Sequence, residues 1–288
     1  MLPRLRACLA SIARPAASTL AIGLLLVAAL PVAAADAPSK FELLDGDRVV
    51  MIGNTLIERE GRYGAIESML AASYPDRRIT FRNLGWSGDT VWGVARAYWE
   101  KPDEGYKSLF DLVEELKPTV VILGYGNNEA FGGPAKLQSF IEQYEKLLTD
   151  LQKHTKRIVI LGLIQPTWEP TSKQHRQQIR EYDAALQKLA EKHGLTFVSL
   201  ADLWQDGKKP SAKTVGSTST LTDDGIHGNT AGYEKLGQLL ASRLQNPTQT
   251  EPAAIANFDE LRALILAKNE LFFHRWRPQN RTYIFGFR

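Results

Sequence analysis

The sequence has 288 residues, a formal net charge of +3 and a single cysteine, Cys8. A charge this small, spread along the chain without a basic stripe, argues against a nucleic-acid partner. One cysteine excludes an internal disulfide. Because Cys8 lies within the first 35 residues, the rest of the chain has no thiol nucleophile and no thiolate metal site.

The first 35 residues have the pattern of a secretory signal peptide. Arg4, Arg6 and Arg14 make a basic start, an apolar run follows, and the small residues of VAAADA offer a cleavage site after Ala35. An uncleaved membrane anchor is the alternative, but the apolar run is shorter than the roughly 20 residues that span a bilayer. We expect residues 1–35 to be removed and the mature protein to be periplasmic or extracellular, with membrane attachment only through this segment if it is retained.

From Asp47 onward, short apolar runs rich in β-formers alternate with longer helical patterns. This alternation predicts an α/β domain over residues 36–245, with a parallel five-stranded sheet and helices on both faces. The predicted strands are Arg48–Ile52, Ile79–Asn83, Val120–Gly124, Ile158–Leu163 and Thr196–Ser199. The predicted helices lie near residues 62–74, 105–116, 135–153, 175–193 and 230–244.

Residues 246–288 follow this domain. The segment NPTQTEP reads as a polar linker, and Phe258–Glu270 reads as a helix whose apolar side packs on the domain. The last segment, FFHRWRPQNRTYIFGFR, is rich in aromatic residues and arginine. We expect this tail to wrap around the domain, because aromatic residues this dense seldom stay in water. The alternatives are that the tail docks a partner or binds a surface.

Ligands of open parallel sheets bind beyond the carboxyl ends of the strands, so the segments after the strands are the ones to examine for chemistry. Four of them are rich in polar and glycine residues. They are Gly53-Asn54-Thr55 after the first strand, NLGWSGDT (83–90) after the second, GYGNNEAF (124–131) after the third, and TDDGIHGNTAGY (222–233), which begins in a loop and runs into a helix.

The order and spacing of these segments resemble the SGNH, or GDSL-like, hydrolases, a family of esterases and acylhydrolases with a flavodoxin-like three-layer fold. The resemblance covers most of the mature chain. It implies that His227 is the general base and Asp224 its orienter, in a full match to the family's D-x-x-H block. It also implies an oxyanion hole formed by the backbone N–H of Gly88 and the side chain of Asn128, with Glu129 where the family's G-x-N-D block has an aspartate.

The residues themselves suit acyl transfer, which needs a hydroxyl, a base within about 3 Å of it, and donors aimed at the oxyanion. An aspartate three residues before a histidine can fold back and bind the Nδ1–H, leaving Nε2 free to take a proton. Taken singly, each residue has a simpler interpretation. Asp224 could cap the following helix, His227 could face solvent, Asn128 could bind its own backbone, and Gly88 could serve a turn that needs positive φ.

The nucleophile position departs from the family pattern. Where the family has G-D-S, this chain has Gly53-Asn54-Thr55, so the hydroxyl belongs to Thr55 and Asn54 is a possible supporting residue. The β-branch of threonine stiffens χ1 and adds a methyl group that would crowd a site built around serine. The G-N-T turn and the aromatic tail together suggest a divergent exported subfamily.

Three interpretations of this position stay open. Thr55 is a slower or substrate-restricted nucleophile, or the site binds a ligand without forming an acyl-enzyme, or the hydroxyl of Ser87 attacks instead. We expect the first, because a base with its orienter serves little purpose in a plain binding pocket.

The expected substrate is a short O-acyl ester, chiefly O-acetyl, on carbohydrate, with a short-chain lipid ester as the alternative. The exported location favours an extracellular or cell-wall ester, and no long apolar insertion suggests a lipase lid. Tryptophans near the strand ends could stack on sugar rings, or could simply pack. These are Trp86, Trp92, Trp99 and Trp168.

The remaining histidines of the mature chain lie on predicted helices or in the tail and have no acid at metal-ligand spacing, so we expect neither a metal nor a cofactor. They are His154, His175, His193 and His274. The oligomeric state and the partner of the tail do not follow from the sequence.

Overall fold

The structure is a computed structural model that describes residues 41–97, 100–168, 171–207, 219–244 and 257–276. The predicted signal peptide, the polar linker and the aromatic tail after Trp276 lie outside these residues. None of the helices in the described part of the chain is long and apolar enough to cross a bilayer.

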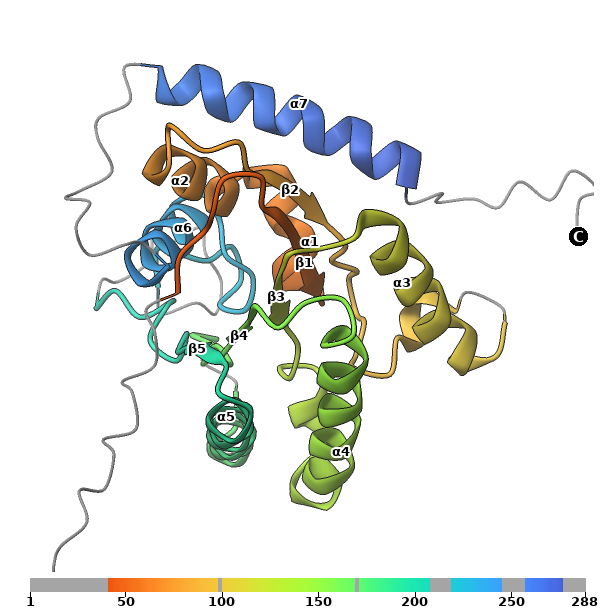
Figure 1. Ribbon diagram of the computed structural model, residues 1–288. Helices are drawn as coiled ribbons and strands as arrows, with labels where there is room; N and C mark the ends of the chain where they lie inside the picture. The colour runs from red at the N-terminus through yellow and green to blue at the C-terminus, as the bar shows by residue number, and fades with distance from the viewer. Residues whose placement is uncertain (1–40, 98–99, 169–170, 208–218, 245–256, 277–288) are drawn as a thin grey trace, which may run out of the picture. The chain divides into compact units, whose positions relative to one another are not determined.

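Five parallel strands form one sheet in the order β2-β1-β3-β4-β5 (Figure 1). They are β1 (Arg48–Gly53), β2 (Thr80–Asn83), β3 (Val120–Gly124), β4 (Ile158–Leu161) and β5 (Thr196–Val198). The central strands β1 and β3 are buried almost throughout, as expected for apolar runs covered on both faces. Gly53 pairs with Gly124, so β1 and β3 end side by side and the segments after them begin together.

Helices cover both faces of the sheet and give the three-layer α/β fold that the sequence predicts. The helices are α1 (Thr55–Tyr63), α2 (Ala65–Ser73), α3 (Pro102–Leu116), α4 (Pro134–Leu151), α5 (Lys173–His193), α6 (Thr230–Arg243) and α7 (Phe258–Trp276). Alternate residues of β1 point to two separate cores. Val49 and Met51 pack with α2 and α6, whereas Val50 and Ile52 pack with α3, α4 and α5, and Figure 1 shows these two groups on opposite sides of the sheet.

The helix predicted near residues 62–74 is wrong in its bounds. The structure has two helices there, α1 and α2, which are separated by Gly64 with φ 60°. Asn54 is the N-cap of α1, and its side chain accepts a hydrogen bond from the Leu56 N–H at 3.1 Å. The turn after β1 therefore ends at Asn54, and Thr55 is the first residue of a helix.

The C-terminal helix α7 packs on α1, α2 and the edge strand β2. It extends beyond its predicted end at Glu270 to Trp276. Lys268 Nζ lies 2.6 Å from a carboxylate oxygen of Glu67 in α2, and Arg262 Nη1 lies 2.9 Å from Glu234 in α6. These ion pairs tie α7 to the helices on the α2 and α6 side of the sheet.

Candidate active site

Candidate residues from several segments line a cleft of about 550 Å³ at the carboxyl ends of the central strands. Thr55, Asn128 and His227 all line this cleft. Thr55 begins α1 directly after β1, Asn128 follows β3, and His227 belongs to the turn before α6. Residues far apart in the sequence are thus gathered at one edge of the sheet, as a parallel arrangement requires.

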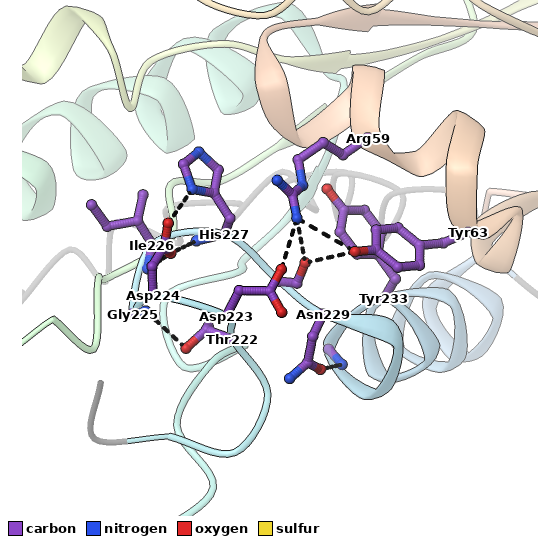
Figure 2. Close-up of polar contacts among 12 residues, drawn as sticks. Arg59, Tyr63, Thr222, Asp223, Asp224, Gly225, Ile226, His227, Asn229 and Tyr233 are labelled. Atoms are coloured by element: carbon purple, nitrogen blue, oxygen red, sulfur yellow. Dashed lines mark hydrogen bonds and ion pairs between the residues drawn. The ribbon is translucent and has the colours of Figure 1, made fainter. Parts of the chain in front are cut away.

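Asp224 and His227 form a hydrogen-bonded pair (Figure 2). The Nδ1 of His227 lies 2.7 Å from Asp224 Oδ2, while Asp224 Oδ1 accepts the backbone N–H groups of Ile226 at 2.9 Å and His227 at 2.7 Å. Burial alone would raise the pKa of Asp224, but the hydrogen bonds from the ring and backbone of His227 and from Ile226 hold this pKa below its ordinary value. An ionised acceptor at Nδ1 favours the tautomer in which Nε2 is free to take a proton.

The turn that carries this pair is closed by local contacts. A β-bridge joins Thr222 to Gly228, and the Thr222 hydroxyl oxygen accepts the Gly225 N–H at 3.1 Å. Gly225 has φ 83°, and a side chain there would come within 2.5 Å of the Trp168 backbone nitrogen. The Thr167 N–H donates to the Gly225 carbonyl at 2.7 Å. A glycine is therefore required at position 225 by both its conformation and its close approach to the loop after β4.

The two candidate oxyanion donors lie in neighbouring loops. The Gly88 N–H donates to the Thr55 hydroxyl oxygen at 3.2 Å, and the φ of 75° at Gly88 suits glycine. Asn128 Nδ2 donates to the Asp89 carbonyl at 3.0 Å. A side-chain amide has two N–H donors, so Asn128 can offer one to the cleft while the other fastens it to Asp89.

Thr55 and His227 both belong to the described part of the chain, and no hydrogen bond joins the hydroxyl to the ring. The hydroxyl oxygen accepts the Gly88 N–H instead. Catalytic hydrogen bonds are commonly long or poorly aligned in sites without substrate. The structure thus places both groups in one cleft without the direct contact that proton transfer needs.

The hydroxyl of Ser87 is held by a carboxylate. It donates to Glu58 in α1, and the Ser87 N–H donates to the same Glu58 Oε2 at 2.8 Å. Ser87, like Gly88 and Asp224, is not among the residues that line the cleft, so the contact with Glu58 is what distinguishes it. This geometry favours a role for Ser87 in fastening the loop after β2 to α1 over a role as the attacking hydroxyl.

Glu129 connects the loops that carry the two candidate donors. Its side chain is buried, and it accepts the Val91 N–H at 2.8 Å and the Gly126 N–H at 2.9 Å with its two oxygens. Burial raises the pKa of Glu129 to about 7 even though these hydrogen bonds favour the ionised form. The residue that departs from the family's G-x-N-D block therefore has a clear structural contact to each loop.

A second buried group, which the sequence analysis did not identify, lies beside these loops. Arg96 Nε is 2.6 Å from Asp89 Oδ2, and the Tyr125 hydroxyl donates to the same oxygen at 2.9 Å. Arg96 also donates to the Leu84 carbonyl at 2.7 Å. Because the Asp89 carbonyl accepts from Asn128, this group fixes the peptide to which a candidate oxyanion donor is attached. The spacing of Asp89 and Arg96 in the sequence gave no signal for the pair.

Two exposed aromatic side chains line the cleft. Phe131 is 73% exposed and its ring stacks on His175 with centroids 4.0 Å apart, and Trp168 is 40% exposed. The sequence analysis identified Trp168 but missed Phe131. His175 was placed on a predicted helix and given no role in the site.

The other three tryptophans named from the sequence differ in their surroundings. Trp86 lines a separate cavity beside α7, with the Arg96 guanidinium over its ring at 5.5 Å. Trp92 is partly buried against the core on the α3 side of the sheet, and Trp99 lies outside the described residues. Within the described ranges, no group of three or more histidine, aspartate or glutamate side chains is arranged to hold a metal ion.

The fold and site together are those of a hydrolase: a three-layer α/β fold with a hydroxyl, a hydrogen-bonded Asp–His pair and candidate oxyanion donors at its strand ends. The profile of the GDSL-like lipase/acylhydrolase family matches residues 46–235. The chain belongs to this family and is an ester-hydrolysing enzyme. A search of curated protein sequences gives no match.

Several solved structures share the fold. An acetylxylan esterase from Geobacillus stearothermophilus superimposes with a TM-score of 0.57 at 17% identity, covering 73% of this chain and 100% of that chain. An alpha/beta hydrolase from the metagenome of Lake Arreo, Spain, gives 0.54 at 19% identity, with 71% and 99% covered. A gut microbial diltiazem-metabolizing enzyme gives 0.56 at 19% identity, with 72% and 49% covered. At these identities the likeness shows a common fold.

Proposed function

We propose that the protein is an exported esterase that removes short acyl groups, chiefly acetyl, from carbohydrate hydroxyls with a triad of Thr55, His227 and Asp224. The observation that carries the proposal is the 2.7 Å contact between His227 Nδ1 and Asp224, in the same cleft as the Thr55 hydroxyl. Export rests on the signal-peptide pattern of the first 35 residues.

The reaction proceeds in two steps. Thr55 Oγ1 attacks the acyl carbon while His227 Nε2 takes its proton, and the carbonyl oxygen becomes an oxyanion held by the Gly88 N–H and Asn128 Nδ2. The C–O bond to the alcohol then breaks, and His227 returns the proton to the leaving oxygen. Water then attacks the acyl-threonine while His227 Nε2 takes its proton. The bond from the acyl carbon to Thr55 Oγ1 breaks, His227 returns the proton to Oγ1, and the acid leaves.

The resting contact between Gly88 and Thr55 must change during this reaction. In the structure, the Gly88 N–H is occupied by the Thr55 oxygen at 3.2 Å. Binding of an ester moves the hydroxyl toward His227 and frees this N–H for the carbonyl oxygen of the substrate. The threonine methyl restricts this rotation, because a β-branched side chain has few χ1 positions.

The cleft lining supports a carbohydrate ester. Phe131 and Trp168 offer flat apolar faces that suit a sugar ring, and Asn127, Gln174 and Gln178 add neutral donors and acceptors for hydroxyl groups. One of the similar folds is that of an acetylxylan esterase, which is consistent with this substrate class.

The triad is tested by assaying wild type, Thr55→Ser, Thr55→Ala and His227→Ala on a panel of acetyl esters. We expect the activity of Thr55→Ser to equal or exceed that of wild type, because the hydroxyl stays and the crowding methyl is removed. Thr55→Ala and His227→Ala should lose at least about 10³-fold in kcat. Activity that survives Thr55→Ala would show that Thr55 is not the nucleophile and would favour Ser87 or a directly activated water.

The substrate class is tested by comparing acetylated xylo-oligosaccharides with p-nitrophenyl acetate and p-nitrophenyl octanoate. Phe131→Ala and Trp168→Ala should each raise KM for the oligosaccharide about 3- to 10-fold, the worth of one aromatic contact, and leave KM for p-nitrophenyl acetate unchanged. Leu271→Ala is the control, since Leu271 is an apolar side chain on α7, outside the cleft, that is as exposed as Phe131. Preference for the octanoate ester would contradict the carbohydrate assignment and support the lipid one.

A further inference from the structure

Arg59 connects the helix that begins at Thr55 to the turn that carries His227 (Figure 2). Its Nη2 lies 2.9 Å from Asp223 Oδ2 and 3.4 Å from the Gly228 carbonyl oxygen. Arg59 lies one helical turn after Thr55, while Asp223 and Gly228 flank the Asp224 and His227 pair on either side. One guanidinium therefore contacts both ends of the short segment that holds the candidate base.

Two tyrosines add to this connection. The Tyr63 hydroxyl, also on α1, donates to the Gly228 carbonyl at 3.4 Å, and its ring stacks on Tyr233 with centroids 4.3 Å apart. The Tyr233 hydroxyl donates to the Leu56 carbonyl at 2.9 Å. Because Tyr233 lies in the first turn of α6, the helix after the His227 turn is attached directly to the first turn of α1.

We propose that Arg59 is a positioning residue, whose ion pair with Asp223 sets the separation between the Thr55 hydroxyl and Nε2 of His227. This inference rests on the proposed function, because it treats those two groups as the reacting pair. Adjacent aspartates thus have different tasks: Asp224 orients the imidazole within the turn, and Asp223 places the whole turn against α1.

Stability does not explain this placement of Arg59. The side chains of Arg59 and Asp223 are 21% and 55% exposed, and an ion pair this open to water adds little to folding. The Nε of Arg59 is buried without a hydrogen-bond partner, which is unfavourable for a charged group. The position of Arg59 therefore lowers the stability of the fold, and we explain it by the placement of the His227 turn relative to Thr55.

The turn is also held by bonds that do not involve Arg59, one within the turn and one to the segment after β5. The Asp223 N–H donates to the His227 carbonyl at 2.9 Å, and Trp204 Nε1 donates to the Ile226 carbonyl at 3.2 Å. Both bonds remain when Arg59 is replaced. The tyrosine contacts to α1 also remain, but the 2.9 Å ion pair at Asp223 is lost, so the Asp223 end of the turn can shift relative to Thr55. A misplacement of about 1 Å can cost on the order of a hundredfold in rate.

The experiment compares Arg59→Met, Arg59→Lys, Asp223→Asn and the double variant Arg59→Met/Asp223→Asn. The control is Arg62→Met, which removes the same charge from the same helix at a residue whose side chain is 70% exposed and 3.9 Å from its ion-pair partner Glu58. The measurements are kcat and KM on an acetyl ester across pH, the thermal midpoint, and amide hydrogen exchange in the turn at residues 222–229.

We expect kcat to fall about 10- to 100-fold in Arg59→Met and Asp223→Asn, with KM changed less than about threefold, because the base is misplaced and substrate contacts remain. The double variant should be no slower than the slower single variant, since both remove one contact. Arg59→Lys should recover part of kcat, because it keeps the charge but loses the planar fork. The thermal midpoint should fall by less than about 4 °C.

Three kinetic results would overturn the proposal. The first is a kcat in Arg59→Met within threefold of wild type. The second is a double variant in which the kcat losses of the two single variants multiply. The third is a raised KM at unchanged kcat in Arg59→Met, which would make Arg59 a substrate-binding residue. Hydrogen exchange tests the same idea without turnover: exchange in the turn should be faster in Arg59→Met and unchanged in Arg62→Met, and equal exchange in wild type and Arg59→Met would also refute it. If wild type hydrolyses no ester, the proposed function fails, and the exchange experiment still decides whether Arg59 holds the turn.

Discussion

Replacing Asp224 with asparagine changes one oxygen in the pair formed with the His227 ring. The retained Oδ1 can still accept the N–H groups of Ile226 and His227, which it does at 2.9 and 2.7 Å, so the turn should keep its shape. The new NH₂ group would face Nδ1 and force it to act as an acceptor. The ring proton would then reside on Nε2, and His227 could no longer take the proton of Thr55.

The size of the kcat loss in Asp224→Asn depends on how exposed the Asp224 and His227 side chains are to solvent. Where such a pair is buried, the same change costs about 10⁴-fold in kcat. Here the side chains of His227 and Asp224 are 36% and 50% exposed, so water can replace part of the lost contact and the ring can rotate to recover the active tautomer. We therefore expect a smaller loss in kcat, about 10²- to 10³-fold, with KM nearly unchanged.

The assay is the initial rate of p-nitrophenyl acetate hydrolysis from pH 5 to 9. Asp45→Asn is the matched control, because Asp45 is an exposed aspartate that pairs with Arg78 at 2.8 Å outside the cleft. It should leave kcat unchanged. A loss of less than tenfold in Asp224→Asn would refute the argument that Asp224 sets the tautomer of the base.

Three further predictions concern buried carboxylates. Burial raises the pKa of Glu60 from 4.5 to about 8, so the folded state binds the Glu60 proton more tightly than the unfolded state does. The stability contributed by protonated Glu60 is therefore fully present below pH 4.5 and is lost as the pH rises through 8. Glu60→Gln should remove part of this decline, measured as the difference in urea midpoint between pH 5 and 8.5. Lys268→Met should lower the free energy of unfolding by about 2 to 3 kcal/mol, because Glu67 is left buried without its partner, and Lys268→Met/Glu67→Gln should recover most of the loss in the same denaturation assay. Glu129→Gln should lower kcat about tenfold at unchanged KM, because an amide can accept only one of the Val91 and Gly126 N–H groups.

Each of these has a clear contrary outcome. An unchanged pH slope in Glu60→Gln would assign the decline to another group. A double variant of Lys268 and Glu67 no more stable than Lys268→Met would show that the unpaired carboxylate is not the cause. A Glu129→Gln enzyme with wild-type kcat would show that the two loops stay in place without the bridge.

The central strands β1, β3 and β4 were predictable from the sequence because burial on both faces leaves a continuous apolar signal. Val120–Gly124 was predicted and is observed with the same bounds, since the run lies between Pro118 and a glycine. Helix α1 was missed although Asn54 and Gly64 provide its end signals. The fully buried Glu60 interrupts the apolar pattern of that helix, and a carboxylate in the core cannot be recognised from periodicity.

The candidate site divides in the same way. Asp224 and His227 are three residues apart, so their contact follows from one turn of chain and was predictable. Arg59 and Asp223 are 164 residues apart, and their contact exists only because α1 and the turn before α6 meet at the sheet edge. Phe131 and His175 likewise come from different segments, and neither carries a local signal for their stacking.

The start of α1 at Thr55 has an electrostatic consequence. The peptide dipoles of a helix add up to about half a positive charge at its amino end, and this field is strongest within the first turn. In this protein the amino end lies at the Thr55 hydroxyl, beside the Gly88 N–H. The cap, Asn54, is neutral, and the Glu58 carboxylate in the same turn accepts the N–H and hydroxyl of Ser87. In the proposed reaction the N–H groups at the start of α1 would therefore favour the negative charge that forms on the acyl oxygen.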